Sequence, residues 1–245
     1  MKILIANWKM NPKTEAEAIR LAKAEDISGA VLCPPFPFLP AVKKVLKKAA
    51  LGAQDAFWEG EGPFTGEISP VQLKKIGVHY VIIGHSERRL HAGETNEMIA
   101  AKMVAALSAG LLPILCVGET AQERAEGKTA DVLALQLRLG LSRVREQKLS
   151  NPFLIAYEPV WSISTFRTGQ AATPEDISNV IPLIESFQGG SAMKILYGGS
   201  VDAKTLAGFL AIPGISGALV GAASLKAGEF GKMILITAQS ISSQA

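Results

Sequence analysis

Glu158 is a carboxylate placed where a run of apolar residues ends. Residues 152–157 form that run, and Pro159, Val160 and Trp161 follow the glutamate directly. In parallel α/β folds, ligands bind at the carboxyl ends of the strands. A carboxylate confined there among apolar side chains suits a general base. The same position also fits a glutamate that only forms a salt bridge at the end of a strand.

Two more side chains that could take part in catalysis follow other apolar runs. Lys9 could anchor an anion, form a Schiff base with a carbonyl substrate, or simply lie on the surface. His85 stands before Ser86 and Glu87, which are predicted to begin a helix. The positive end of a helix favours a neutral imidazole, which can donate a hydrogen bond to a carbonyl oxygen. A purely capping histidine is the alternative.

Small residues follow the last two apolar runs of the chain. The sequence reads Gly198-Gly199-Ser200 after one run and Gly221-Ala222 after the other. Small side chains let backbone N–H groups approach an anion closely, and barrels commonly bind phosphate after strands seven and eight. These residues are therefore candidates for a phosphate site, with tight turns as the alternative.

The elements that must position these residues alternate along the whole chain. Apolar runs predict strands at 2–6, 29–33, 51–54, 80–83, 111–117, 153–157, 193–197 and 217–220. Amphipathic runs predict helices at 14–24, 38–48, 95–109, 129–147, 174–187, 202–210 and 227–240. Near-continuous apolar strands are typical of a parallel sheet buried on both faces. The pattern predicts a (β/α)8 barrel with one domain over residues 1–245; an open doubly wound sheet is the alternative.

Composition excludes several classes of protein. The chain has 245 residues, 48% of them hydrophobic, and its net charge of +3 is too small to imply binding to nucleic acid. No apolar run reaches the roughly 20 residues that span a membrane. The two cysteines, Cys33 and Cys116, lie inside apolar runs without metal-ligand spacing, which fits a reducing, cytoplasmic compartment. Cys116 lies near the predicted site but is expected to be a buried structural thiol.

Several motifs together resemble triosephosphate isomerase, and they occur in order at the strand ends over essentially the whole chain. They read Ala6-Asn7-Trp8-Lys9-Met10-Asn11, Gly84-His85-Ser86-Glu87-Arg88-Arg89, Ala156-Tyr157-Glu158-Pro159-Val160-Trp161 and Tyr197-Gly198-Gly199-Ser200-Val201, supported by Cys33-Pro34-Pro35, Phe64-Thr65-Gly66-Glu67 and Cys116-Val117-Gly118-Glu119. The resemblance implies a TIM barrel that interconverts dihydroxyacetone phosphate and D-glyceraldehyde 3-phosphate through an enediol(ate), in glycolysis and gluconeogenesis. It implies no metal and no organic cofactor.

The resemblance also implies a role for each matching residue. Catalytic roles fall to Asn7, Lys9, His85 and Glu158, with Glu158 as the base and His85 as the electrophile. Binding of the substrate falls to Asn7, Lys9, Ser164, Ser200, Gly221 and Ala222, and supporting roles fall to Ser86, Glu87 and Cys116. The Phe64-Thr65-Gly66-Glu67 loop implies a homodimer.

The segment 162–173, which resembles the lid of the family, departs from the common pattern. It is longer than usual, so either Ser164 or the Arg167-Thr168-Gly169 stretch takes the place of the phosphate-binding glycine. Ala222 also replaces a glycine that is common after the eighth strand. Two other functions stay open: an aldolase-like barrel enzyme that uses Lys9 as a Schiff base, and a binding protein that keeps the pocket without catalysis.

Overall fold

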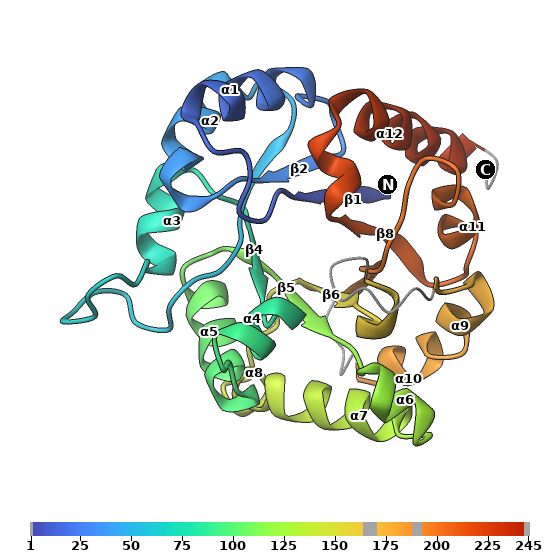
Figure 1. The fold of residues 1–245 in the computed structure, drawn as a ribbon. Coiled ribbons are helices and arrows are strands. Elements are labelled where there is room, and N and C mark those ends of the chain that lie inside the picture. Colours follow the sequence, from blue (N-terminus) through green and yellow to red (C-terminus); the bar gives the residue numbers. More distant parts are fainter. Residues whose placement is uncertain (1, 164–170, 188–192, 243–245) are drawn as a thin grey trace.

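Eight parallel strands form a closed barrel in which β1 pairs with both β2 and β8 (Figure 1). The computed structural model describes residues 2–163, 171–187 and 193–242. The strands are β1 (Ile3–Asn7), β2 (Ala30–Cys33), β3 (Ala50–Ala53), β4 (Tyr80–Ile83), β5 (Leu112–Val117), β6 (Phe153–Tyr157), β7 (Met193–Tyr197) and β8 (Ile215–Val220). The predicted (β/α)8 barrel is thus confirmed, and the open sheet is excluded.

The strands are apolar on both faces because each face is buried against a different layer. In β1, Leu4 and Ala6 belong to the large apolar cluster that the barrel shares with its surrounding helices. Ile5 belongs to a separate cluster that fills the barrel interior. Side chains alternate between the two faces of a strand. Asn7 therefore faces inward like Ile5, at the end of the barrel where the strands terminate.

Helices surround the barrel and connect its strands (Figure 1). They are α1 (Glu15–Ala24), α2 (Leu39–Val45), α3 (Pro70–Ile76), α4 (Ser86–His91), α5 (Asn96–Ser108), α6 (Ala121–Ala125), α7 (Thr129–Gly140), α8 (Ser142–Glu146), α9 (Pro174–Ser178), α10 (Ile181–Glu185), α11 (Leu206–Leu210) and α12 (Ala227–Ser242). Two predicted helix starts are confirmed: Thr14 caps α1 and Thr173 caps α9, each with a reciprocal capping box. The predictions did not include α3 and α6.

Two predicted helices are interrupted in the structure. The predicted helix 129–147 divides into α7 and α8 at Leu141, directly after Gly140, a residue type of low helix propensity. The predicted helix 174–187 divides into α9 and α10. Pro182 has no N–H to continue the hydrogen bonds of a single helix, so a new helix starts just before it.

Two other predicted helices are shorter than expected because aspartates bind backbone N–H groups at their ends. The predicted helix 38–48 ends as α2 at Val45, since the Asp26 carboxylate accepts the N–H groups of Lys48 and Ala49 at 2.7 and 2.8 Å. The predicted helix 202–210 is helical only as α11. Asp202 instead accepts the backbone N–H groups that follow it.

No helix within residues 2–163, 171–187 and 193–242 is long and apolar enough to cross a membrane.

Candidate active site

A pocket of about 110 Å³ opens where the strands of the barrel end. Elements from both halves of the chain surround it: the ends of β1, β4, β6, β7 and β8 all contribute to its wall. The sequence-predicted residues that line it are Asn7, Lys9, His85, Glu158, Ser200, Gly221 and Ala222. The closed barrel thus gathers residues that are up to 215 positions apart in the chain.

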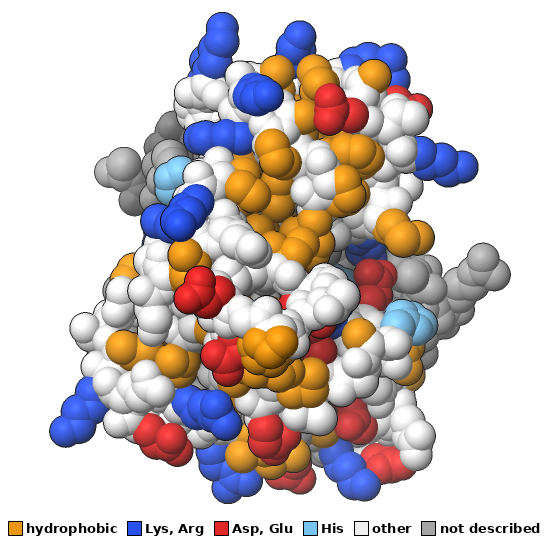
Figure 2. Space-filling view, turned by 90° about the vertical axis from the view of Figure 1, so that its left-hand side faces the viewer, with side chains coloured by type: hydrophobic (Ala, Val, Ile, Leu, Met, Phe, Trp, Pro, Cys, Tyr) orange, Lys and Arg blue, Asp and Glu red, His pale blue; other side chains and the backbone are white. Residues whose placement is uncertain are grey.

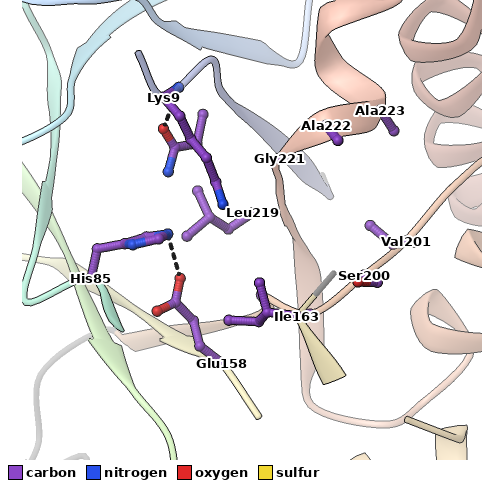
Figure 3. Close-up of a pocket in the computed structure, with 13 residues that line it drawn as sticks. Lys9, His85, Glu158, Ile163, Ser200, Val201, Leu219, Gly221, Ala222 and Ala223 are labelled. Carbon is purple, nitrogen blue, oxygen red and sulfur yellow. Dashed lines mark hydrogen bonds and ion pairs between the residues drawn. The ribbon is translucent and has the colours of Figure 1, made fainter. Parts of the chain in front are cut away.

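Glu158 is 2% exposed and is held by one of its two oxygens. Oε2 accepts the backbone N–H of Ser86 at 3.0 Å. Oε1 lies 3.1 Å from Nε2 of His85 (Figure 3), yet it accepts no hydrogen bond of good geometry from any described residue. One carboxylate oxygen is therefore fixed, while the other keeps its lone pairs for a proton.

His85 is the N-cap residue of α4 and turns its two ring nitrogens to different partners. Nδ1 accepts the backbone N–H of Glu87 at 3.2 Å. A nitrogen that accepts a hydrogen bond carries no proton, so the imidazole is neutral with its proton on Nε2. The Nε2–H group is therefore the donor that faces Glu158 and the pocket.

Lys9 places a positive charge in the pocket, and its backbone has an unusual conformation. Its Nζ lies 2.6 Å from Oε1 of Glu87, and its φ of +53° is left-handed, which is uncommon for a residue other than glycine. Asn7 Oδ1 accepts the backbone N–H of Lys9 at 3.0 Å, and Gln54 donates to the Lys9 carbonyl at 2.7 Å. These contacts hold the turn that directs the ammonium group inward.

Small residues lie across the pocket from His85 and Glu158 (Figure 3). Gly221 precedes a 3-10 helix, Ala222–Leu225, and Ser200 follows β7 with its hydroxyl donating to the Ser162 carbonyl at 2.7 Å. A β-carbon on Gly199 would lie 2.2 Å from the Tyr197 hydroxyl, so this turn excludes any side chain. This side of the pocket can bring backbone N–H groups close to an anion.

Cys116 is a buried thiol in the barrel interior, as expected. It lines a neighbouring cavity of about 540 Å³, which also borders Glu158 and Ser86, rather than the pocket itself. Burial raises the pKa of the Cys116 thiol well above its usual range, and the nearby Glu158 carboxylate raises it further. A thiol in this environment stays protonated and is a poor nucleophile.

The segment after Glu158 is anchored by a residue to which the sequence analysis gave no role. Glu119 accepts the indole N–H of Trp161 at 2.7 Å and the Tyr157 hydroxyl at 3.1 Å. Burial raises the pKa of the Glu119 carboxyl. The guanidinium of Arg124 stacks 3.5 Å from the centre of the Trp161 ring. The sequence signals for Glu119 were its place two residues after a strand and its membership of the Cys116-Val117-Gly118-Glu119 motif.

Other residues of the pocket wall were also missed by the sequence analysis. They are apolar or small and carry no chemical signature: Ile163, Val201, Leu219 and Ala223. The available signals were their position beside predicted site residues and, for Val201, its place in the motif that begins at Tyr197. The predicted lid contact Ser164, and its alternatives Arg167 and Gly169, lie outside the described residues. Among the residues that the structure does describe, no group of three or more His, Cys, Asp or Glu side chains could hold a metal ion.

Comparison with known proteins agrees with this architecture. The family model described as Triosephosphate isomerase matches residues 2–237. Similar curated proteins named triosephosphate isomerase occur in Caldanaerobacter subterraneus subsp. tengcongensis, at 46% identity over 95% of this chain and 98% of the relative, and in Dictyoglomus thermophilum, at 45% identity over the same shares. A relative of the same name from Clostridium tetani is 40% identical over 95% of both chains. The chain therefore belongs to the triosephosphate isomerase family and is an isomerase.

Proposed function

We propose that this isomerase interconverts dihydroxyacetone phosphate and D-glyceraldehyde 3-phosphate through an enediol(ate), in glycolysis and gluconeogenesis. The names of the family and of its relatives support the substrate. One observation carries the chemistry: Oε1 of Glu158, which accepts no hydrogen bond from the described residues, lies 3.1 Å from Nε2 of His85 in a pocket that Lys9 also lines. Moving a proton next to a carbonyl group needs such a base, a donor for the carbonyl oxygen and a compensating positive charge.

In this proposal, Glu158 Oε1 takes a proton from one substrate carbon and returns it to the neighbouring carbon. The His85 Nε2–H group donates to the carbonyl oxygen, a pairing of roles well known for triosephosphate isomerases. The Lys9 ammonium and the Asn7 amide N–H groups stabilise the negative charge that develops on the substrate oxygens. Lys9 Nζ lies 2.6 Å from the Glu87 carboxylate, whereas lysines that form Schiff bases lie in an apolar pocket or beside another cation, which argues against a Schiff base at Lys9.

The phosphate group is proposed to bind on the other side of the pocket. Ser200 and the backbone N–H groups of Gly221 and Ala222 line that side, and Ser164 is proposed to join them. Binding a phosphate that does not react supplies energy for orienting the carbons that do. The methyl group of Ala222 is exposed at the rim, where it limits how closely the phosphate approaches.

Three residues are proposed to support this chemistry without carrying it. Ser86 fixes Glu158 by its backbone N–H, so that Oε1 is the oxygen that remains available. Glu87 fixes the proton of His85 on Nε2 and orients Lys9. Cys116 lies behind Glu158 and fills the barrel interior as a neutral thiol.

A coupled assay of D-glyceraldehyde 3-phosphate isomerisation tests the proposal, with Glu158→Asp as the key variant. Shortening the side chain withdraws the base from the substrate, and a misplacement of about 1 Å costs on the order of a hundredfold in rate. We expect fast turnover by the wild type and a kcat lowered about a hundredfold or more in the variant. Negligible turnover by folded wild-type protein would overturn the proposal in favour of a non-catalytic phosphate-binding protein. Trapping of substrate on Lys9 by borohydride would instead favour an aldolase-like enzyme.

The chain is further proposed to act as a homodimer in the cytoplasm. The segment between β3 and α3, which contains the Phe64-Thr65-Gly66-Glu67 loop, projects away from the barrel (Figure 1). Phe64 stays 39% exposed although its ring contacts Phe57 at 4.8 Å, and Met10, next to Lys9, is 90% exposed. Figure 2, which views the side from which the loop projects, shows hydrophobic side chains gathered in a band. Exposed apolar patches of this kind support a protein–protein interface.

A further inference from the structure

Glu25 is a fully buried carboxyl group at the end of α1, outside the pocket. Its Oε2 accepts the indole N–H of Trp8 at 3.1 Å. Its Oε1 is buried without a hydrogen-bond partner in the part of the chain that the structure describes. Burying a carboxyl group with one oxygen unpaired costs free energy, so its contact with Trp8 is the interaction that can offset this cost.

Trp8 links Glu25 to the pocket because it stands between two residues that line it. Trp8 packs in the apolar cluster that the barrel shares with its helices, whereas its neighbours Asn7 and Lys9 line the pocket. The Trp8 backbone N–H is held by the Cys33 carbonyl at 3.2 Å. Its indole ring is fully buried. Holding the ring therefore holds the peptide that leads directly into Lys9.

Lys9 depends on this support because its backbone is in the left-handed region, with φ of +53°. This conformation is unfavourable for a side chain other than glycine and persists only where surrounding contacts enforce it. The contacts from Asn7 and Gln54 restrain the peptide groups on either side of the Lys9 α-carbon. The Glu25–Trp8 hydrogen bond restrains the residue immediately before it.

We propose that Glu25 is a positioning residue that fixes the Lys9 ammonium in the pocket by holding the indole ring of Trp8. The inference rests on the proposed function, in which Lys9 binds the substrate. Glu25 itself does not line the pocket.

The protonation state of Glu25 gives this contact a distinctive signature. Burial raises the pKa of Glu25 to about 8, and the Trp8 N–H lowers it only in part. No charged side chain of the described residues contributes to this shift. The neighbouring carboxylate of Asp26 is instead engaged by the backbone N–H groups of Lys48 and Ala49. Glu25 is therefore mostly protonated at pH 7. Above about pH 8 it becomes a buried charge with no countercharge among the described residues, which favours opening of the site to water and displacement of Trp8.

Two variants of matched size separate positioning from general stability. Glu25→Gln keeps a carbonyl oxygen for the indole N–H, whereas Glu25→Met fills the same space with a thioether sulfur that is only a weak acceptor. We expect wild-type KM in Glu25→Gln and, in Glu25→Met, a KM for D-glyceraldehyde 3-phosphate raised roughly tenfold, the effect of one buried donor left unpaired. Partial unfolding would lower the apparent kcat and leave KM unchanged. Folded Glu25→Met with wild-type KM would overturn the proposal, as would a KM raised equally in both variants.

A spectroscopic measurement tests the contact independently of activity. The chain has three tryptophans, so ¹⁹F NMR of protein labelled with 5-fluorotryptophan resolves few signals, and Trp8→Phe identifies the one from Trp8. We expect the chemical shift of this signal to change near pH 8 in the wild type and to stay constant in Glu25→Gln. This test does not require Glu25→Met to fold. A Trp8 signal that is constant over this range in the wild type would overturn the proposal.

Failure of the proposed function would look different from failure of this inference. If the wild type does not turn over triose phosphate, calorimetric binding of inorganic phosphate to wild type, Glu25→Gln and Glu25→Met replaces KM as the readout. Weaker phosphate binding by Glu25→Met alone would then support positioning of Lys9. Equal binding by all three proteins would overturn it.

Discussion

Gly198 leaves the space that the Glu158 side chain occupies. Adding a single methyl group at position 198 tests whether this space is required. A β-carbon at position 198 would lie 2.7 Å from Cγ of Glu158 and 3.2 Å from the Tyr157 carbonyl. Both distances are shorter than ordinary contacts, so the Glu158 side chain must move. We expect Gly198→Ala to lower kcat by about a hundredfold, as a displacement of about 1 Å at the base would, with KM changed less.

Gly228→Ala is the matched control for that substitution. Gly228 lies in α12, and a β-carbon there would meet nothing within 4 Å. Steady-state kinetics of the two variants, with circular dichroism to verify folding, gives the comparison. Wild-type kcat in folded Gly198→Ala would contradict the proposal that the position of Glu158 limits the reaction.

At the scale of elements, a buried ionic cluster joins α4 and α5 to the loop after β3. Lys102 of α5 is 2% exposed and lies 2.8 Å from both oxygens of Asp55, and it also contacts Glu94. Arg88 of α4 contacts the same two carboxylates. Removing one partner of a buried ion pair leaves an uncompensated charge, which costs about 3–5 kcal/mol. We expect Lys102→Met to lower the free energy of unfolding by this amount, as measured by denaturant titration.

Lys128→Met is the control for the ionic cluster. Lys128 pairs with Glu126 at 2.6 Å, but its side chain is 57% exposed. Exposed ion pairs contribute about 0–1 kcal/mol, so this variant should unfold close to the wild type. If Lys102→Met and Lys128→Met lower the free energy of unfolding equally, the buried cluster contributes no more to stability than an exposed ion pair.

The raised pKa of Glu25, at the end of α1, makes the stability of the protein depend on pH. The pKa of Glu25 is raised from its ordinary value of 4.5 to about 8 in the folded protein. The folded state therefore binds a proton more tightly than the unfolded state, and this contribution to stability is present at low pH and is lost as pH rises from about 4.5 through about 8. We expect the free energy of unfolding of the wild type to fall relative to Glu25→Gln over this window, by several kcal/mol at most. The free energy of unfolding of both proteins is measured by denaturant titration at pH 5 and pH 9. The same difference between wild type and Glu25→Gln at both pH values would contradict the raised pKa.

At the scale of the whole molecule, the projecting loop makes the oligomeric state testable. Phe64 lies on the loop and is partly exposed, so a charge there should block an apolar interface. We expect light scattering to give twice the chain mass of 25.9 kDa for the wild type and the single-chain mass for Phe64→Asp. Leu235→Asp is the control, since Leu235 is 64% exposed on α12, away from the loop. A wild type that scatters as a single chain at micromolar concentration would contradict the proposed homodimer.

The amino-acid pattern was enough to predict the order of the strands and the place of the candidate catalytic residues, whereas it left an open doubly wound sheet as the alternative to the barrel. These features are local: an apolar run of five residues predicts a buried strand, and the residue after it marks the rim. Lys9, His85 and Glu158 were found because each stands within three residues of the end of such a run, and the role of Asn7 came from the resemblance of its motif to a known family. The starts of the helices predicted at 14–24 and 174–187 were readable for the same reason, since the capping boxes of Thr14 and Thr173 each span only four residues.

The contacts between distant segments could not be read from the sequence and became visible in the folded chain. Asp26 ends α2 from 21 or more positions away, Glu119 holds Trp161 across 42 positions, and Glu25 reaches Trp8 across 17. Each depends on which helix packs against which strand, and no local pattern of residues encodes that. The same applies to the pocket, because closure of the barrel between β1 and β8 places Lys9 beside Gly221. The candidate catalytic residues could therefore be predicted from the sequence, because their chemistry depends on residue type. The contacts that orient them could not, because those contacts form only when distant segments pack together.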